Sequence, residues 1–152
     1  MSERNRIAMT EDEVSGLITG QRKLQLGTIN PDGTPHMVTM FYAMVDGKIG
    51  FWSYRSSQKG RNIERDPRVT CLIEAGEDYF ELRGAMVYGK VQVLTDPNEV
   101  RRVGTEVVKR MMDLQDEETI APFVEHTAAK RHAYLVDIVR VASWDHRKLA
   151  AG

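Results

Sequence analysis

The stretch Lys23-Leu24-Gln25-Leu26-Gly27-Thr28-Ile29 alternates apolar and polar residues with the period of two that is typical of a half-buried β-strand. It is followed by Asn30-Pro31-Asp32-Gly33, in which proline fixes φ and glycine permits a positive φ, so a turn is expected. A second strand is predicted over residues 35–44. Asp46-Gly47 is a hairpin signal, and a third strand is predicted over 48–54. Three antiparallel strands joined as a meander are therefore expected before residue 55.

Helix and strand patterns alternate through the rest of the chain. Thr10-Glu11-Asp12-Glu13 is a capping box and predicts a short helix before the first strand. Asp96 followed by Pro97 is typical of the start of a longer helix. Gly84 and Gly89 lie inside a predicted strand and indicate bends or bulges in it. The remaining expected elements are short helices over 56–65 and within 116–130, and strands over 68–74, 79–94 and 133–141.

About six antiparallel strands with flanking helices predict a mostly β, α+β fold. A closed or nearly closed barrel is favoured, because closure removes the exposed edges of such a sheet. The length of 152 residues suits one domain. We therefore expect a single domain over 1–152.

The composition excludes several classes of protein. The chain has 21 Lys+Arg against 22 Asp+Glu, with 28% charged and 41% hydrophobic residues. These values argue against disorder, collagen-like repeats and nucleic-acid binding by bulk positive charge. The lone Cys71 has no cysteine partner, and no apolar run approaches the roughly 18 residues that a membrane span requires. We expect a cytoplasmic protein without a membrane or nucleic-acid partner.

The common catalytic and metal-binding motifs do not occur in this sequence. The four histidines, His36, His126, His132 and His146, are scattered without metal-ligand spacing, so no metal site is expected. Cys71 lies on the apolar face of a predicted strand, which favours a packing role. There is no glycine-rich phosphate loop, nucleophile elbow or recognisable triad spacing. No catalytic residue is assigned from the sequence.

The segment Tyr54-Arg55-Ser56-Ser57-Gln58-Lys59-Gly60-Arg61 places hydroxyl and basic side chains where a strand gives way to a helix. The start of a helix has unpaired N–H groups and a partial positive charge, so it favours an anion. The hydroxyl of Ser57 and the ammonium of Lys59 beside those groups would complete a phosphate site. The alternative interpretation is an ordinary serine cap followed by solvent-exposed basic residues.

Two blocks of the sequence resemble a known family. Residues 26–36 are similar to the "L-x-T-x-x-x-D-G-x-P" signature of the pyridoxamine 5′-phosphate oxidase-like split-barrel flavoproteins. Residues 57–69 match their "S-x-K-x-R-N-I/L-x-R-D-P-R-V" segment almost position for position. Residues 84–91 fit the following strand and residues 141–144 the last one. The resemblance covers about residues 10–145.

The resemblance implies a six-stranded antiparallel split β-barrel of the FMN-binding type, which forms a homodimer with a flavin-type cofactor in each of two clefts between the subunits. In that scheme Lys59, with Ser57 and Arg55 as weaker candidates, binds the cofactor phosphate, and Arg61 is a lesser candidate whose role depends on its reaching the cofactor's acidic tail. The remaining residues that the resemblance places at the cofactor are Met37, Val38, Thr39, Met40 and Phe41 along its ring, Thr28, Trp52 and Ser53 in the same cleft, and Trp144 and Tyr79 from the partner chain.

The sequence departs from the true pyridoxamine phosphate oxidases, because it lacks their long N-terminal extension and their C-terminal "R-L-x-P" ending. It is more similar to the branch that uses the deazaflavin coenzyme F420. The function that this resemblance implies is an F420-dependent oxidoreductase, which transfers a hydride between the deazaflavin and a small conjugated substrate. The alternatives are an FMN-dependent enzyme of the same fold, a cofactor carrier without turnover, and a dimeric binding module unrelated to flavins.

Overall fold

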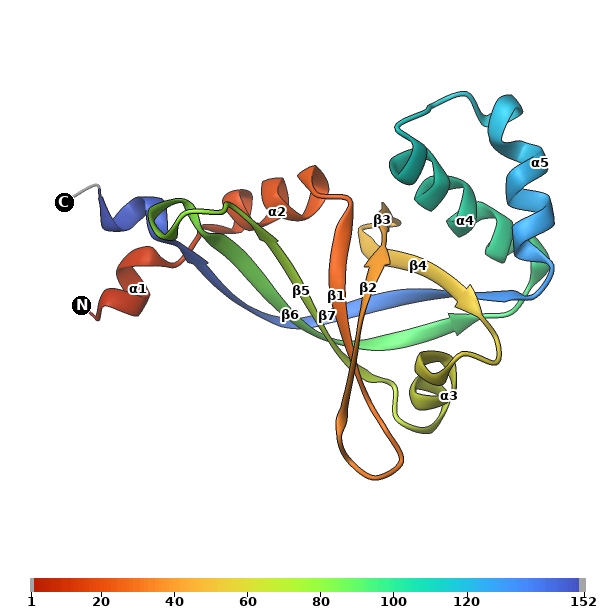
Figure 1. Ribbon diagram of the computed structural model, residues 1–152, viewed down its shortest axis with the longest axis horizontal. Coiled ribbons are helices and arrows are strands. Elements are labelled where there is room, and N and C mark those ends of the chain that lie inside the picture. Colours follow the sequence, from red (N-terminus) through yellow and green to blue (C-terminus); the bar gives the residue numbers. More distant parts are fainter. Residues whose placement is uncertain (1, 151–152) are drawn as a thin grey trace.

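A computed structural model describes residues 2–150 of the chain. Its centre is one antiparallel sheet of seven strands in the order β2-β1-β5-β6-β7-β4-β3 (Figure 1). The strands are β1 (Lys23–Ile29), β2 (Pro35–Phe41), β3 (Ala43–Val45), β4 (Lys48–Tyr54), β5 (Arg68–Ala75), β6 (Arg83–Leu94) and β7 (Arg131–Asp145). The helices are α1 (Glu3–Ile7), α2 (Glu11–Gly20), α3 (Gln58–Arg65), α4 (Pro97–Met112), α5 (Glu117–Ala128) and the 3₁₀ turns η1 (Tyr79–Glu81) and η2 (His146–Leu149).

The sheet curls because its two ends are joined by a single residue. β2 lies at one end of the strand order and β3 at the other, yet only Tyr42 separates them in the chain. Tyr42 is fully buried, and its hydroxyl donates to the carbonyl of Ile18 in α2. The expected three-strand meander is therefore wrong at its second step, since β2 pairs with β1 while β3 and β4 continue from β7. The result is a half-barrel whose open seam lies between β2 and β3, the two ends of the strand order.

The strand count differs from the sequence-based expectation of six. The inward turn at Tyr42 divides the predicted second strand into β2 and β3. The predicted strand over 79–94 begins only at Arg83, because residues 79–81 form η1 and the carbonyl of Leu82 accepts a hydrogen bond from the backbone of His146. The short helix α1 was not predicted, and β7 extends beyond both predicted ends.

The turn and bulge predictions are confirmed by the backbone. Gly33 has φ of 86°, and Asp46 and Gly47 have φ of 54° and 75° in the β3–β4 hairpin. The register of β6 against β7 shifts between Tyr88 and Gly89, which is a bulge. A Cβ at position 89 would lie 2.5 Å from Cγ1 of Val136, so this close approach requires glycine. The predicted helix within 116–130 is present as α5.

Two hydrophobic clusters hold the fold together. The first fills the concave side of the sheet beneath α2, and the second lies between the sheet and the α4–α5 pair, which stands at one end of the molecule (Figure 1). Cys71 belongs to the first cluster, where burial raises the pKa of its thiol to about 12. This agrees with the packing role expected for it.

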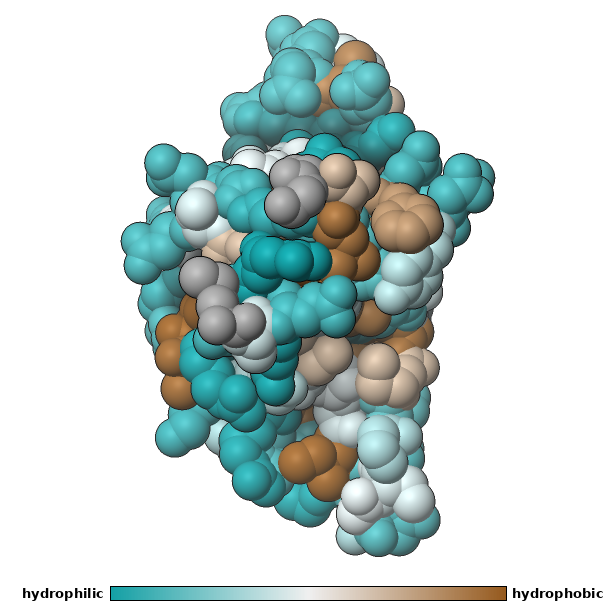
Figure 2. Space-filling model, turned by 90° about the vertical axis from the view of Figure 1, so that its left-hand side faces the viewer, coloured by the Kyte–Doolittle hydropathy of each residue, from teal (hydrophilic) through white to brown (hydrophobic). Residues whose placement is uncertain are grey.

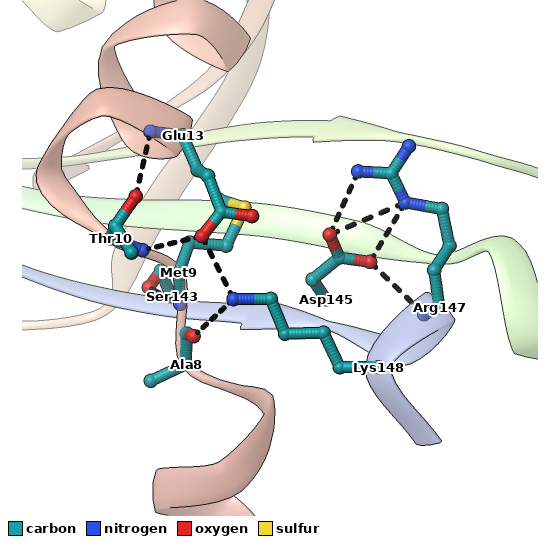
Figure 3. Close-up of polar contacts among 8 residues, drawn as sticks. All are labelled: Ala8, Met9, Thr10, Glu13, Ser143, Asp145, Arg147 and Lys148. Atoms are coloured by element: carbon teal, nitrogen blue, oxygen red, sulfur yellow. Dashed lines mark hydrogen bonds and ion pairs between the residues drawn. The ribbon is translucent and has the colours of Figure 1, made fainter. Parts of the chain in front are cut away.

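Residues 8–13 contact residues 143–148 beside the end of β7 (Figure 3). Thr10 and Glu13 form the predicted capping box of α2, and Lys148 donates to Glu13 Oε1 at 2.8 Å. Asp145 and Arg147 form a second ion pair of 2.8 Å. Seen from this end, the surface is mostly hydrophilic with separate hydrophobic residues (Figure 2). No helix within residues 2–150 is long and apolar enough to cross a membrane.

Candidate functional site

The junction of β4 and α3 places two serines and a lysine at one helix start. Ser57 is the N-cap of α3, and its Oγ accepts the backbone N–H of Gly60 at 3.1 Å. The hydroxyl of Ser53, on β4, lies 3.3 Å from that of Ser57. The N–H groups of Gln58 and Lys59 in the first turn have no intrahelical acceptor, as at any helix start. Ser57 thus caps the helix while two N–H groups remain available for an anion.

Lys59 carries a positive charge that no neighbouring carboxylate neutralises. The side chain is half-buried, and burial first and the charge of Arg131 second lower the pKa of its ammonium group. Within residues 2–150 its ammonium forms no ion pair. A bound anion would offset both the desolvation and the repulsion from Arg131.

A buried asparagine fixes α3 against the sheet. The side-chain amide of Asn62 donates to Thr28 Oγ1 and to Asn30 Oδ1, each at 3.0 Å. Its oxygen accepts from Gln58 Nε2 at 2.9 Å, and Arg65 donates to the carbonyl of Ile29 one turn further along. This network determines where the start of α3 stands relative to β1.

Thr28 is therefore placed in the packing between β1 and α3. Its side chain is 2% exposed and its hydroxyl is used by Asn62. Sequence reasoning included Asn62 only as one letter of a motif, because the partners of a buried amide cannot be read from spacing.

Of the other basic candidates, one has a contact elsewhere and one lies in solvent. Arg55 donates through Nη2 to the carbonyl of Ala129 at 3.0 Å, so its guanidinium reaches the end of α5. Arg61 is exposed on α3. The structure thus brings together Ser53, Ser57 and Lys59, and it directs Arg55 to a neighbouring cavity.

β2 offers an unpaired backbone edge. It pairs with β1 and stands at the end of the strand order, so its other edge has free N–H and C=O groups. Val38 and Met40 pack inward against the first hydrophobic cluster, whereas Met37 and Thr39 are exposed on the opposite face. Such an edge can meet the polar rim of a planar ring, as expected for the strand Met37–Phe41.

Trp52 lies on β4 but its ring is directed into the second hydrophobic cluster. It is 7% exposed, and a Cβ at Gly104 of α4 would lie 2.1 Å from Cζ3 of the indole. Its neighbour Ser53 is buried at 3% exposure beside Ser57. Of these two candidates, Ser53 contributes a polar atom near the start of α3.

Tyr79 and Trp144 lie at the far end of the sheet from α3. Tyr79 is 62% exposed in η1, beyond the end of β5 that is remote from α3. Trp144 is paired with Gly84, and a Cβ on that glycine would lie 2.5 Å from Cζ2 of the indole. Within one chain neither residue is close to Lys59, so a role at the cofactor requires a second subunit.

The structure adds residues that the sequence did not single out. Arg131, at the start of β7, lies with its guanidinium carbon 4.1 Å from the ring centroid of Tyr54 and 5.5 Å from that of Trp52. Its Nε is buried without a hydrogen-bond partner, as is Nδ1 of His36 on β2. No spacing rule joins Arg131 to Tyr54, because only strand pairing brings them together. Within residues 2–150, no three His, Cys, Asp or Glu side chains are grouped to hold a metal ion.

The split half-barrel with its capped helix start and free strand edge is the fold of the pyridoxamine 5′-phosphate oxidase-like split-barrel class. The family model described as pyridoxamine 5′-phosphate oxidase matches residues 10–145, and the chain belongs to that family. Comparison with curated protein sequences gives no match.

Several solved structures share the fold. A conserved hypothetical protein of Mycobacterium tuberculosis, Rv2991, is 37% identical with a TM-score of 0.90, over 99% of this chain and 93% of that one. An F420 reductase is 21% identical with a TM-score of 0.67, over 87% and 98% of the two chains. A heme-binding protein of Mycobacterium smegmatis is 15% identical with a TM-score of 0.64, over 91% and 59%. The last two likenesses concern the fold alone.

Proposed function

We propose that the protein is an F420-dependent oxidoreductase that transfers a hydride between the deazaflavin and a small conjugated substrate. The observation that carries the proposal is the unneutralised, half-buried Lys59 beside the free N–H groups of α3 and the hydroxyl of Ser57. An anionic phosphate satisfies each of these groups. The resemblance of residues 57–69 to the F420-using branch, together with the shared fold of an F420 reductase, supports the choice of cofactor.

The residues present fit a phosphate-bearing flavin-type cofactor. Lys59 and the first turn of α3 would hold the phosphate, and the free edge of β2 along Met37–Phe41 would receive the polar edge of the ring system. The deazaflavin supplies the hydride chemistry when bound. The chain supplies orientation, because the inward side chains of β2 pack against the core and hold its free edge in place.

A second copy of the chain completes this proposal. Met37, Tyr88 and Val139 line an outward-facing hollow of about 470 Å³, and Met37 and Val139 are 58% and 65% exposed. The grouping of exposed apolar side chains around one hollow supports a contact surface there. We expect a homodimer burying more than about 2,000 Å². Sedimentation that shows a monomer at micromolar concentration, with or without cofactor, overturns it.

The cofactor is tested by absorption spectra of the purified protein, titrated separately with oxidised F420, reduced F420 and FMN. Saturable perturbation by F420 supports the proposal, and perturbation by FMN alone supports the alternative FMN-dependent enzyme. If neither ligand perturbs the spectrum, the flavin-type assignment fails. Turnover with a conjugated acceptor then separates an enzyme from a carrier that only binds the cofactor.

A further inference from the structure

A small cavity lies between the α4–α5 pair and the paired ends of β4 and β7, and it is distinct from the start of α3. Its volume is about 190 Å³. Arg55, Arg101, Arg131 and His132 line it, and Glu125 is the one carboxylate among its lining residues. We call this cavity the arginine pocket. With three guanidinium groups and one carboxylate, its lining carries an excess of two positive charges.

We propose that the arginine pocket binds a small oxyanion: a free ion such as phosphate, or the phosphate or carboxylate group of a larger ligand. Three planar guanidinium groups around a small cavity suit bidentate recognition of such groups. The proposal depends on the cavity and not on the identity of the cofactor.

The three arginines differ in whether their guanidinium groups already have an acceptor. Arg55 donates to the carbonyl of Ala129, and Arg101 lies 3.6 Å from Glu125. Arg131 has a buried Nε without a partner, and its guanidinium is held over the rings of Tyr54 and Trp52 rather than by an acceptor. A buried polar group without a partner carries a desolvation cost that a bound acceptor would offset. Stacking on the rings also fixes the guanidinium in place before any ligand arrives.

Burial first, and the positive charges of Arg55 and Arg131 second, lower the pKa values of the neighbouring His132 and Lys59. Burial, and then the charge of Arg55, lower the pKa of His132, while Glu64 raises it less. The charge of Arg131 contributes to the lowered pKa of Lys59. A bound anion would counteract the part of each shift that comes from the arginine charges, since an opposite charge favours the protonated forms.

His132 provides a local probe of binding by the unmodified chain. The imidazole resonances of the four histidines are followed by NMR against pH, with and without inorganic phosphate, in a zwitterionic buffer. We expect phosphate to raise the pKa of His132 saturably. The control is the resonance of His146, which is bonded to the carbonyl of Tyr79 at the other end of the sheet and should not respond to phosphate. If His132 shows no saturable response to phosphate, the proposal is overturned.

The matched variants are Arg131→Gln and Arg140→Gln. Both remove one positive charge from an arginine stacked on a tyrosine, because Arg140 lies 3.9 Å from the ring centroid of Tyr88. We expect Arg131→Gln to weaken phosphate binding roughly tenfold to a hundredfold, and Arg140→Gln to leave it unchanged. Arg131→Lys, which keeps the charge without the planar fork, should fall between them. Equal losses in the two glutamine variants would show a general charge effect and contradict the pocket.

Lys59→Gln separates this pocket from the start of α3. If that variant abolishes the His132 response as fully as Arg131→Gln does, phosphate is held at α3 and the arginine pocket fails. If the response survives, the pocket is a separate anion site, even where no flavin-type ligand binds. Repeating the titration with F420 and FMN identifies the source of the oxyanion: a His132 shift at lower ligand concentration than with phosphate assigns it to the larger ligand.

Discussion

The amide nitrogen of Asn62 lies 3.0 Å from Thr28 Oγ1 across 34 residues of sequence, and both side chains are almost completely buried. This contact joins the helix that carries Lys59 to the strand beside β2. The proposed phosphate site at the start of α3 and the proposed ring-binding edge of β2 therefore lie at a fixed distance from each other. The hydrogen bonds of Asn62 hold the two sequence blocks 26–36 and 57–69 next to each other.

We expect Asn62→Ala to lower the free energy of unfolding by about 1–3 kcal/mol, because it leaves the buried hydroxyl of Thr28 without its partner. Urea unfolding measures the change. The control is Asn98→Ala, which removes an exposed amide bonded to Arg101 and should change stability by less than about 0.5 kcal/mol. Equal effects of the two substitutions would show that the Asn62 network is not a special contribution.

Lys59→Ala should weaken cofactor binding roughly tenfold to somewhat over a hundredfold, as expected for loss of a charge-assisted hydrogen bond of about 1.5–3 kcal/mol. The fold should be almost unaffected, because the ammonium has no ion pair to lose among the described residues. The measurements are a cofactor titration and thermal unfolding of the apo protein. Arg61→Ala, on the exposed side of the same helix, should reduce the affinity less than Lys59→Ala does. Unchanged affinity in Lys59→Ala would mean that Ser57 only caps the helix.

Two helical glycines should respond oppositely to alanine. Gly104→Ala places a Cβ about where the indole of Trp52 lies, so we expect a loss of about 1–3 kcal/mol from overpacking. Gly16→Ala in α2 has nothing within 4 Å of the new Cβ, so it should stabilise by roughly 0.5–1 kcal/mol through helix propensity. Chemical denaturation of both variants tests the pair. A stabilising effect at position 104 would mean that Trp52 does not pack against α4.

Asp145 should make stability depend on pH at the acid end. Hydrogen bonds from Arg147 lower the pKa of its carboxyl below the ordinary value of 3.8. A carboxyl with a depressed pKa in the folded state stabilises the protein above its unfolded pKa, and this contribution is lost as pH falls through the folded value. Asp145→Asn should therefore destabilise at pH 7 and approach the wild type only as the pH falls through the lowered folded-state pKa of Asp145.

Thermal unfolding from pH 7 to pH 2.5 measures the difference between Asp145→Asn and the wild type. Glu3→Gln, which removes an exposed carboxylate 3.8 Å from Arg6, is the control and should track the wild type throughout. A difference for Asp145→Asn that stays constant across the acid range would contradict the role of the ionised carboxylate.

The sequence by itself determined the local elements of this protein. The capping residues of α2, α3 and α4, the turns at Gly33 and Asp46-Gly47, and the bulge at Gly89 depend on short-range geometry and on glycine, proline and hydroxyl chemistry. Each of these signals is contained within a few residues, so it can be read without a partner. The resemblance of residues 26–36 and 57–69 indicated the family for the same reason, because both blocks are local.

Only the tertiary structure decided which elements meet. The buried turn at Tyr42 sends the chain from one end of the sheet to the other, and no local pattern distinguishes this from a continued meander. The same limit applies to the site. The two acceptors of the Asn62 amide, on Thr28 and Asn30, lie more than 30 residues away, and Arg131 meets Tyr54 only through the pairing of β4 with β7. Side-chain partners across strands depend on register and curvature, and these follow from how the whole sheet closes around its core.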